Sequence, residues 1–236
     1  MPYELYYWDG LQGRGEFIRL ALEAAGARYK DMARIEGDGV IEELAEQART
    51  PSFAPPVLVD GDVVVGQTAA ILMHLGPKLG LVPRDARLRL WAHQIQLTIA
   101  DFVVEAHDTH HPVGAGLYYE QQRPEAKRRA REFREERVPK FLAWFETIFE
   151  RNVAGQKWLI GRRPGYVDFS LFHVASGLAY AFPHLWDDIS GDYPLVVAHR
   201  ERVAELPALK PYLRSKRHLA FNESDLFRHY PALDPA

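Results

Sequence analysis

The chain has 236 residues, of which 47% are hydrophobic and 26% charged, an ordinary composition for a globular protein with a sizeable core. Its net charge is only −3, so we expect no nucleic-acid partner. No apolar run nears the ~20 residues of a membrane span, and no export signal is recognised, so we expect a cytoplasmic protein without a membrane partner. The chain contains no cysteine, which excludes disulfides, thiolate metal sites and a cysteine nucleophile.

The first third of the chain alternates strand and helix signals. Residues 3–8 are aromatic and apolar, and two valine-rich runs flank Asp60-Gly61, a dipeptide typical of a hairpin with a type I′ turn. Gly26 stands where the C-terminal cap of a helix is expected. The order of these elements predicts a thioredoxin-like α/β domain over residues 1–79. Its expected strands span 3–8, 27–35 and the hairpin 57–65, and its expected helices span 15–25, 40–47 and 67–79.

After a linker at residues 80–85, no strand signal remains. We therefore expect an all-helical C-terminal domain over residues 86–236. The tail after Phe221 has no clear period, but it carries apolar and aromatic residues, so we expect it to pack on the domain. The expected helices span 86–111, 124–152, 168–181, 194–205 and 208–217.

Three short motifs contain the candidate functional residues. A tyrosine, Tyr7, ends the first expected strand, and strand alternation places it on the opposite face from Tyr6. Thr68 stands at the start of a helix, where free N–H groups and the helix dipole favour a bound carboxylate. The motifs read Tyr7 with Gln12-Gly13-Arg14-Gly15-Glu16, then Pro55-Pro56-Val57, then Gln67-Thr68-Ala69-Ala70-Ile71.

The order and spacing of these motifs resemble those of the cytosolic glutathione S-transferases, in particular tyrosine-type, sigma-like bacterial members. The resemblance implies a thioredoxin-like domain followed by a helical bundle, glutathione as co-substrate and a homodimer. It also implies that the Tyr7 hydroxyl, assisted by the positive charge of Arg14, stabilises the glutathione thiolate by a hydrogen bond. The further implied site residues are Pro55, Pro56 (in cis), Gln67 and Thr68 against glutathione, Glu105 against the glutathione of the opposite subunit, and Trp8, His107 and His111 around the electrophile.

Three features depart from the family pattern. Pro55 has no N–H to donate to glutathione, although the residue before the cis proline normally supplies one. Residues 37–43 contain neither the tryptophan nor the lysine that sigma-like members use for the glycine carboxylate. Gly165 stands where the family has a serine or threonine that forms a capping box with the acid three residues later, here Asp168.

The resemblance therefore implies a detoxification enzyme that conjugates the glutathione thiolate to an electrophilic, hydrophobic substrate. Peroxide reduction or isomerisation at the same site, and a non-catalytic binding or interaction protein of the same fold, are the alternatives. His107 and His111 lie four residues apart, a spacing found in zinc sites. No His-Glu-X-X-His motif and no cysteine accompany them, so we expect no metal.

Overall fold

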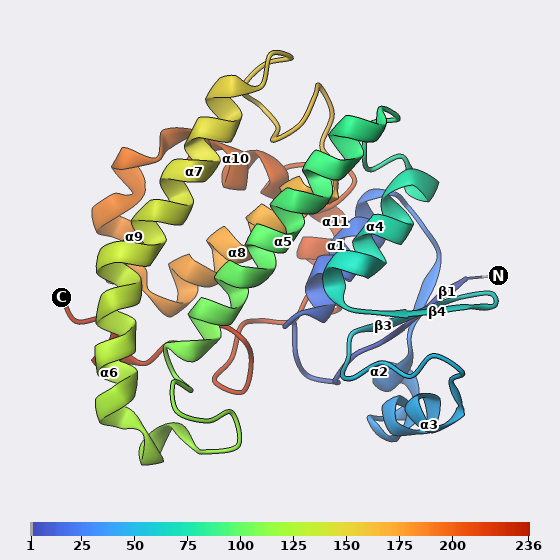
Figure 1. The fold of residues 1–236 in the computed structure, drawn as a ribbon, viewed down its shortest axis with the longest axis horizontal. Coiled ribbons are helices and arrows are strands. Elements are labelled where there is room, and N and C mark those ends of the chain that lie inside the picture. The colour runs from blue at the N-terminus through green and yellow to red at the C-terminus, as the bar shows by residue number, and fades with distance from the viewer. Residues whose placement is uncertain (1) are drawn as a thin grey trace.

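The N-terminal part of the protein is a four-stranded mixed sheet covered by helices on both faces (Figure 1). The computed structural model describes residues 2–236. The strands lie in the order β2-β1-β3-β4, with β1 and β2 parallel and the other pairs antiparallel. The elements are β1 (Tyr3–Tyr6), α1 (Gly15–Ala24), β2 (Tyr29–Asp31), α2 (Met32–Glu36), α3 (Gly39–Gln47), β3 (Val57–Asp60), β4 (Val63–Gly66) and α4 (Thr68–Leu79).

Alternation along the strands decides which helices cover which face of the sheet. Leu5 and Leu58 belong to the large core shared with α1 and α4. Tyr6 and Val57, one residue away on each strand, belong to a second core with Met32 of α2 and Ile41 of α3. Alternation thus separates Tyr6 from Leu5 as expected, whereas Tyr7 lies past the end of β1 and belongs to neither core.

The rest of the chain is helical, as predicted. Two helices, α6 and α7, continue through a π-helical turn at Phe133–Arg137 and form one long rod at the side of the molecule farthest from the sheet (Figure 1). None of the helices in the described part of the chain is long and apolar enough to cross a bilayer. The helices are α5 (Ala86–Asp108), α6 (Arg123–Glu132), α7 (Val138–Arg151), α8 (Tyr166–Ala181), α9 (Pro183–Ile189), α10 (Pro194–Ala204) and α11 (Lys210–Leu213).

One apolar core joins the two parts of the chain. Residues 15–22 of α1 are all buried, because α1 packs between the sheet and α8. Side chains of α1, α4, α5 and α8 therefore belong to the same cluster. The division of the chain at residues 80–85 stays a prediction about folding units.

Several local predictions need correction. The strand expected over 27–35 ends at Asp31, because Met32 and Ala33 turn into a short helix and are buried beneath the sheet. The hairpin loop is Gly61-Asp62, and of its two residues only Gly61 has a positive φ. The turn therefore has glycine first, as in type II′, and is not type I′. The helix expected over 86–111 ends at Asp108, and α9 was not foreseen.

A steric constraint explains why a glycine, Gly165, stands at the start of α8 in place of serine or threonine. The Asp168 carboxylate accepts hydrogen bonds from the N–H groups of Gly165 and Leu159, both at 2.8 Å, and lies 3.1 Å from Nε2 of His199. A Cβ atom at residue 165 would stand 2.7 Å from the carbonyl oxygen of Leu81. That oxygen is fixed, since it accepts a hydrogen bond from the N–H of Tyr166 at 3.0 Å.

We expect Gly165→Ser to lower the free energy of unfolding by about 1–3 kcal/mol, the usual cost of overpacking. The added hydroxyl offsets only a few tenths of a kcal/mol, the usual advantage of serine over glycine at a cap. Gly191→Ser is the matched control, because a Cβ there meets no atom within 4 Å. Urea unfolding measures both variants, and a Gly165→Ser protein as stable as the control would contradict the steric explanation.

Candidate functional site

The Tyr7 side chain lies just past the end of β1 and is 6% exposed. Its hydroxyl oxygen accepts a hydrogen bond from the N–H of Arg14 at 2.9 Å. The hydroxyl donates to no atom of residues 2–236, so its own proton is not used within the described chain. Burial raises the pKa of Tyr7 above its ordinary value, which keeps the hydroxyl a neutral donor at pH 7.

The two glycines of the Gly-Arg-Gly motif make room for this tyrosine. A Cβ at Gly13, whose φ is +42°, would lie 2.0 Å from the Tyr7 hydroxyl oxygen. A Cβ at Gly15 would lie 2.6 Å from the ring. The motif therefore sets the distance between the backbone of the first helix turn and the Tyr7 hydroxyl.

A buried arginine that no sequence motif indicated holds the loop before this turn. Arg19 is fully buried, and its guanidinium donates to the carbonyl oxygens of Leu11 and Gln12 at 3.1 Å each. The same group pairs with Asp31 at 2.6 Å and with Glu16 at 3.4 Å. Because the charge is paired on both sides, it can remain in the core while it fixes two loop carbonyls.

The C-terminal segment, residues 219–230, holds the loop from the other side. Asp225 is 4% exposed, and its Oδ2 accepts hydrogen bonds from the N–H groups of Gln12 at 3.0 Å and Gly13 at 3.2 Å. Asn222 donates to the carbonyl of Gly10 at 3.1 Å. The prediction that this tail packs on the protein is confirmed, but its contact with the Tyr7 loop was not foreseen.

A cavity of about 610 Å³ opens beside Arg14, between the loop Phe53–Pro56, the start of α4 and α5. The Pro55-Pro56 peptide bond is cis, as predicted. Gln67 has φ +67°, an unusual value for a residue other than glycine that is often found at functional sites. The Thr68 hydroxyl is buried and makes no hydrogen bond within residues 2–236. The structure thus brings together, around one cavity, Arg14, Pro55, Pro56, Gln67 and Thr68.

Glu105 does not join these residues. Its carboxylate forms a two-point ion pair with Arg137, at 2.7 Å for each bond, and a further contact with Arg129 at 3.2 Å. These arginines hold the pKa of Glu105 below its ordinary value against the opposing effect of burial. Asp101, one turn earlier on α5, is exposed. The predicted contact of Glu105 with a partner's glutathione stays untested, and the two arginines argue against it.

His107 and His111 lie together at the end of α5, and a third histidine, His110, joins them. Burial lowers the pKa of His107 to about 4, with a smaller effect from the nearby His111 and Arg14. Burial also lowers the pKa of His110 to about 3. Burial lowers the pKa of His111 as well, so the rings of the cluster favour the uncharged form at pH 7, and the Arg14 charge acts on His107.

Comparison with known proteins shows which chains this protein is similar to. Residues 107–216 match the family model described as "Glutathione S-transferase, C-terminal domain". A glutathione S-transferase of Plasmodium falciparum is 24% identical over 90% of this chain and 95% of its own length. Glutathione S-transferase A3 of Mus musculus is 29% identical over 89% of this chain and 87% of its own. The solved structure of an Onchocerca volvulus Pi-class glutathione S-transferase, 23% identical, superposes with a TM-score of 0.73 over 94% of this chain and 98% of its own.

The chain has the glutathione S-transferase fold. The family match and the curated relatives make the chain similar to glutathione S-transferases in sequence as well. They do not distinguish the tyrosine-type, sigma-like subclass.

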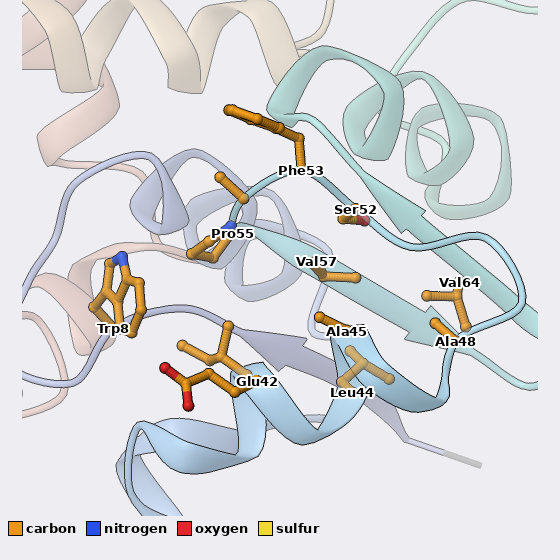
Figure 2. A pocket seen from close by; sticks show the side chains of 12 residues that line it. Trp8, Glu42, Leu44, Ala45, Ala48, Ser52, Phe53, Pro55, Val57 and Val64 are labelled. Atoms are coloured by element: carbon orange, nitrogen blue, oxygen red, sulfur yellow. The ribbon is translucent and has the colours of Figure 1, made fainter.

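Within this glutathione S-transferase fold, Trp8 lies away from the larger cavity. It stands at one end of an apolar cleft of about 250 Å³ between α3 and the chain from Ser52 to Val57 (Figure 2). Pro55 separates the cleft from the larger cavity and lines both. The charged residue of the cleft lining is Glu42. The cleft lining therefore supplies no cation that could take the place of the lysine that residues 37–43 lack.

Proposed function

We propose that the protein is a tyrosine-type glutathione S-transferase that conjugates the glutathione thiolate to an electrophile. The observation that carries the proposal is the Tyr7 hydroxyl, which accepts a hydrogen bond from Arg14 N–H and keeps its own proton for a ligand. A donor aimed at sulfur favours the thiolate, which is the attacking form of the thiol. The accepted bond polarises the hydroxyl and strengthens this donation.

Glutathione fits the surface between Tyr7 and α4. The N-terminus of α4 and the unpaired Thr68 hydroxyl suit the γ-glutamyl carboxylate. Pro55 retains its carbonyl oxygen as an acceptor for the cysteine N–H of glutathione. Tyr7 is not among the residues that line the cavity, but Arg14, whose N–H binds the Tyr7 hydroxyl, is among them. We therefore expect the thiol to lie toward Tyr7, with the positive potential of Arg14 beside it.

The electrophile then lies on the helical side of the thiol. We expect His107, near the end of α5, and His111, just after it, to border this region, because the Arg14 charge acts on His107. Trp8 contributes from the other side only if the substrate extends past Pro55, because Trp8 lines the separate cleft. Holding thiolate and electrophile together supplies much of the rate acceleration.

A conjugation assay with glutathione and 1-chloro-2,4-dinitrobenzene, beside a peroxidase assay with cumene hydroperoxide, tests the proposal. Saturable turnover in the first assay supports a conjugating transferase, and turnover in the second alone indicates the peroxidase alternative. Glutathione binding is measured separately by calorimetry. Tight binding without turnover of any electrophile would favour the non-catalytic alternative, which the missing N–H of Pro55 motivates.

We further infer a homodimer, because α5 presents an uncovered apolar stripe. Leu90, Leu97 and Val104 are exposed by 71%, 47% and 49% and recur every seven residues. This spacing places them on one face of the helix, as in helices that pack against a partner. Phe53, fully exposed at the edge of the larger cavity, adds an aromatic side chain to the same side of the molecule.

We expect Phe53→Ser to weaken the dimer by at least about 2 kcal/mol, or roughly 30-fold in dissociation constant, as for an aromatic anchor. Ile35→Ser removes another exposed apolar side chain, on α2, and serves as the control. Sedimentation equilibrium measures both variants. A monomeric wild type at micromolar concentration, or equal dimerisation of Phe53→Ser, would contradict the inference.

A further inference from the structure

The end of α5 and the turn after it carry three histidines whose ring nitrogens converge. One nitrogen from each of His107, His110 and His111 lies within 4.8 Å of the other two. The His107 and His111 rings stack with centroids 5.2 Å apart, and the His110 ring stands edge-on to both. Spacings of three and four residues place the side chains on one side of this short stretch.

A backbone contact fixes the tautomer of the buried member. His110 is 1% exposed, and its Nε2 lies 3.0 Å from the carbonyl oxygen of Leu226, in the C-terminal segment. A carbonyl only accepts, so Nε2 must carry the proton and Nδ1 must carry the lone pair. Nδ1 of His110 in turn faces Nδ1 of His111. Metal-binding histidines are oriented in this way, by donation from the other ring nitrogen to a backbone carbonyl.

We propose that His107, His110 and His111 bind a divalent first-row transition-metal ion of the zinc class. Imidazole nitrogens suit Zn²⁺, Co²⁺, Ni²⁺ and Cu²⁺, whereas Mg²⁺ and Ca²⁺ prefer oxygen. Three protein ligands leave a fourth position for water, as in zinc sites that are not purely structural. The proposal replaces the expectation from sequence that the chain holds no metal, which considered only two of the three histidines.

Charged side chains around the three histidines have opposite effects on a bound cation. Arg14 and Arg228 act on His107 as like charges and would repel a bound cation. Asp108, whose Oδ1 lies 3.8 Å from Nδ1 of His107, attracts it. In the metal-free protein His111 Nδ1–H donates to His110, so an ion must replace this hydrogen bond and leave the His111 proton on Nε2. None of these steps involves glutathione, so the proposal is independent of the proposed activity.

The test is direct metal binding by the full, untagged chain after treatment with a chelator. Co²⁺ is followed by its visible absorption and Zn²⁺ by calorimetry, without glutathione. We expect about one ion per chain, and at least about tenfold weaker binding in both His107→Gln and His111→Gln. His184→Gln, an exposed histidine on α9, should bind as the wild type does. The two cluster variants are chosen because their side chains are partly exposed, and circular dichroism verifies their fold.

A fourth variant separates metal binding from a structural effect. Arg228→Gln removes a repelling charge without removing a ligand, so it should tighten the binding of Zn²⁺. Tighter binding in this variant, together with loss in the histidine variants, would establish the site. The proposal is overturned if the wild type shows no saturable binding, or if His107→Gln and His111→Gln both bind Zn²⁺ like the wild type.

Discussion

Replacement of Tyr7 by phenylalanine is expected to lower kcat/KM for thiol conjugation by roughly 10²-fold, the usual effect of removing one hydrogen bond that stabilises an anion. The ring keeps its place between Gly13 and Gly15, so the cavity retains its shape. The variant loses the donor to sulfur and leaves the Arg14 N–H without its acceptor, which costs about 1 kcal/mol of stability.

The thiolate absorbance of bound glutathione, titrated across pH, measures the effect at the sulfur. A hydrogen bond to the thiolate lowers the thiol pKa by about 1–3, so the wild type should hold more thiolate at pH 7 than the variant. Tyr6→Phe is the matched control, because the Tyr6 hydroxyl lies 3.3 Å from Glu4 and its ring packs with the second core, under α2 and α3. An unchanged thiol pKa in Tyr7→Phe would transfer the role to another group, with Arg14 the first candidate.

The parts of the fold that were predictable from sequence depend on local signals. Gly26 ends α1 with φ +63°, and the N–H of Ala27 returns to the carbonyl of Leu22 at 2.9 Å, which is the expected C-cap geometry. The valine-rich hairpin likewise formed where its pattern placed it. Met32 and Ala33 were predicted as strand but form a helix. Their burial under the sheet is a tertiary effect, which their local sequence pattern does not show.

The same distinction between local and long-range signals decides which residues of the candidate site were predictable. Arg14, Pro56 and Thr68 were recognisable because each belongs to a short contiguous motif. Asp225 is more than 200 residues from the loop that it holds, in a segment without helical period, so no local pattern indicated its contacts. The arginine partners of Glu105 were not foreseen for a related reason, since they lie 24 and 32 residues further along the chain.

Asp225→Ala is expected to reduce turnover by about tenfold and the free energy of unfolding by about 2–4 kcal/mol. The substitution leaves the buried N–H groups of Gln12 and Gly13 without an acceptor, at about 1–3 kcal/mol each, partly offset by relaxation of the loop. Turnover falls because these residues precede Arg14, whose N–H orients the Tyr7 hydroxyl. A misplaced hydroxyl affects kcat more than the KM for glutathione, since most of the glutathione contacts lie elsewhere.

The charge of Asp225 supplies a readout that loss of loop structure alone would not give. Asp225 raises the pKa of Tyr7, in addition to the larger effect of burial, so removing the carboxylate should lower that pKa. Asp225→Asn removes the charge but keeps a carbonyl oxygen for the two N–H groups, so it should recover most of the turnover while the Tyr7 pKa stays lowered. Asn222→Ala removes an outer contact of the same segment and should change little, because that bond is exposed. Equal loss of turnover in Asp225→Asn and Asp225→Ala would mean that the negative charge itself, and not the position of the loop, supports the reaction.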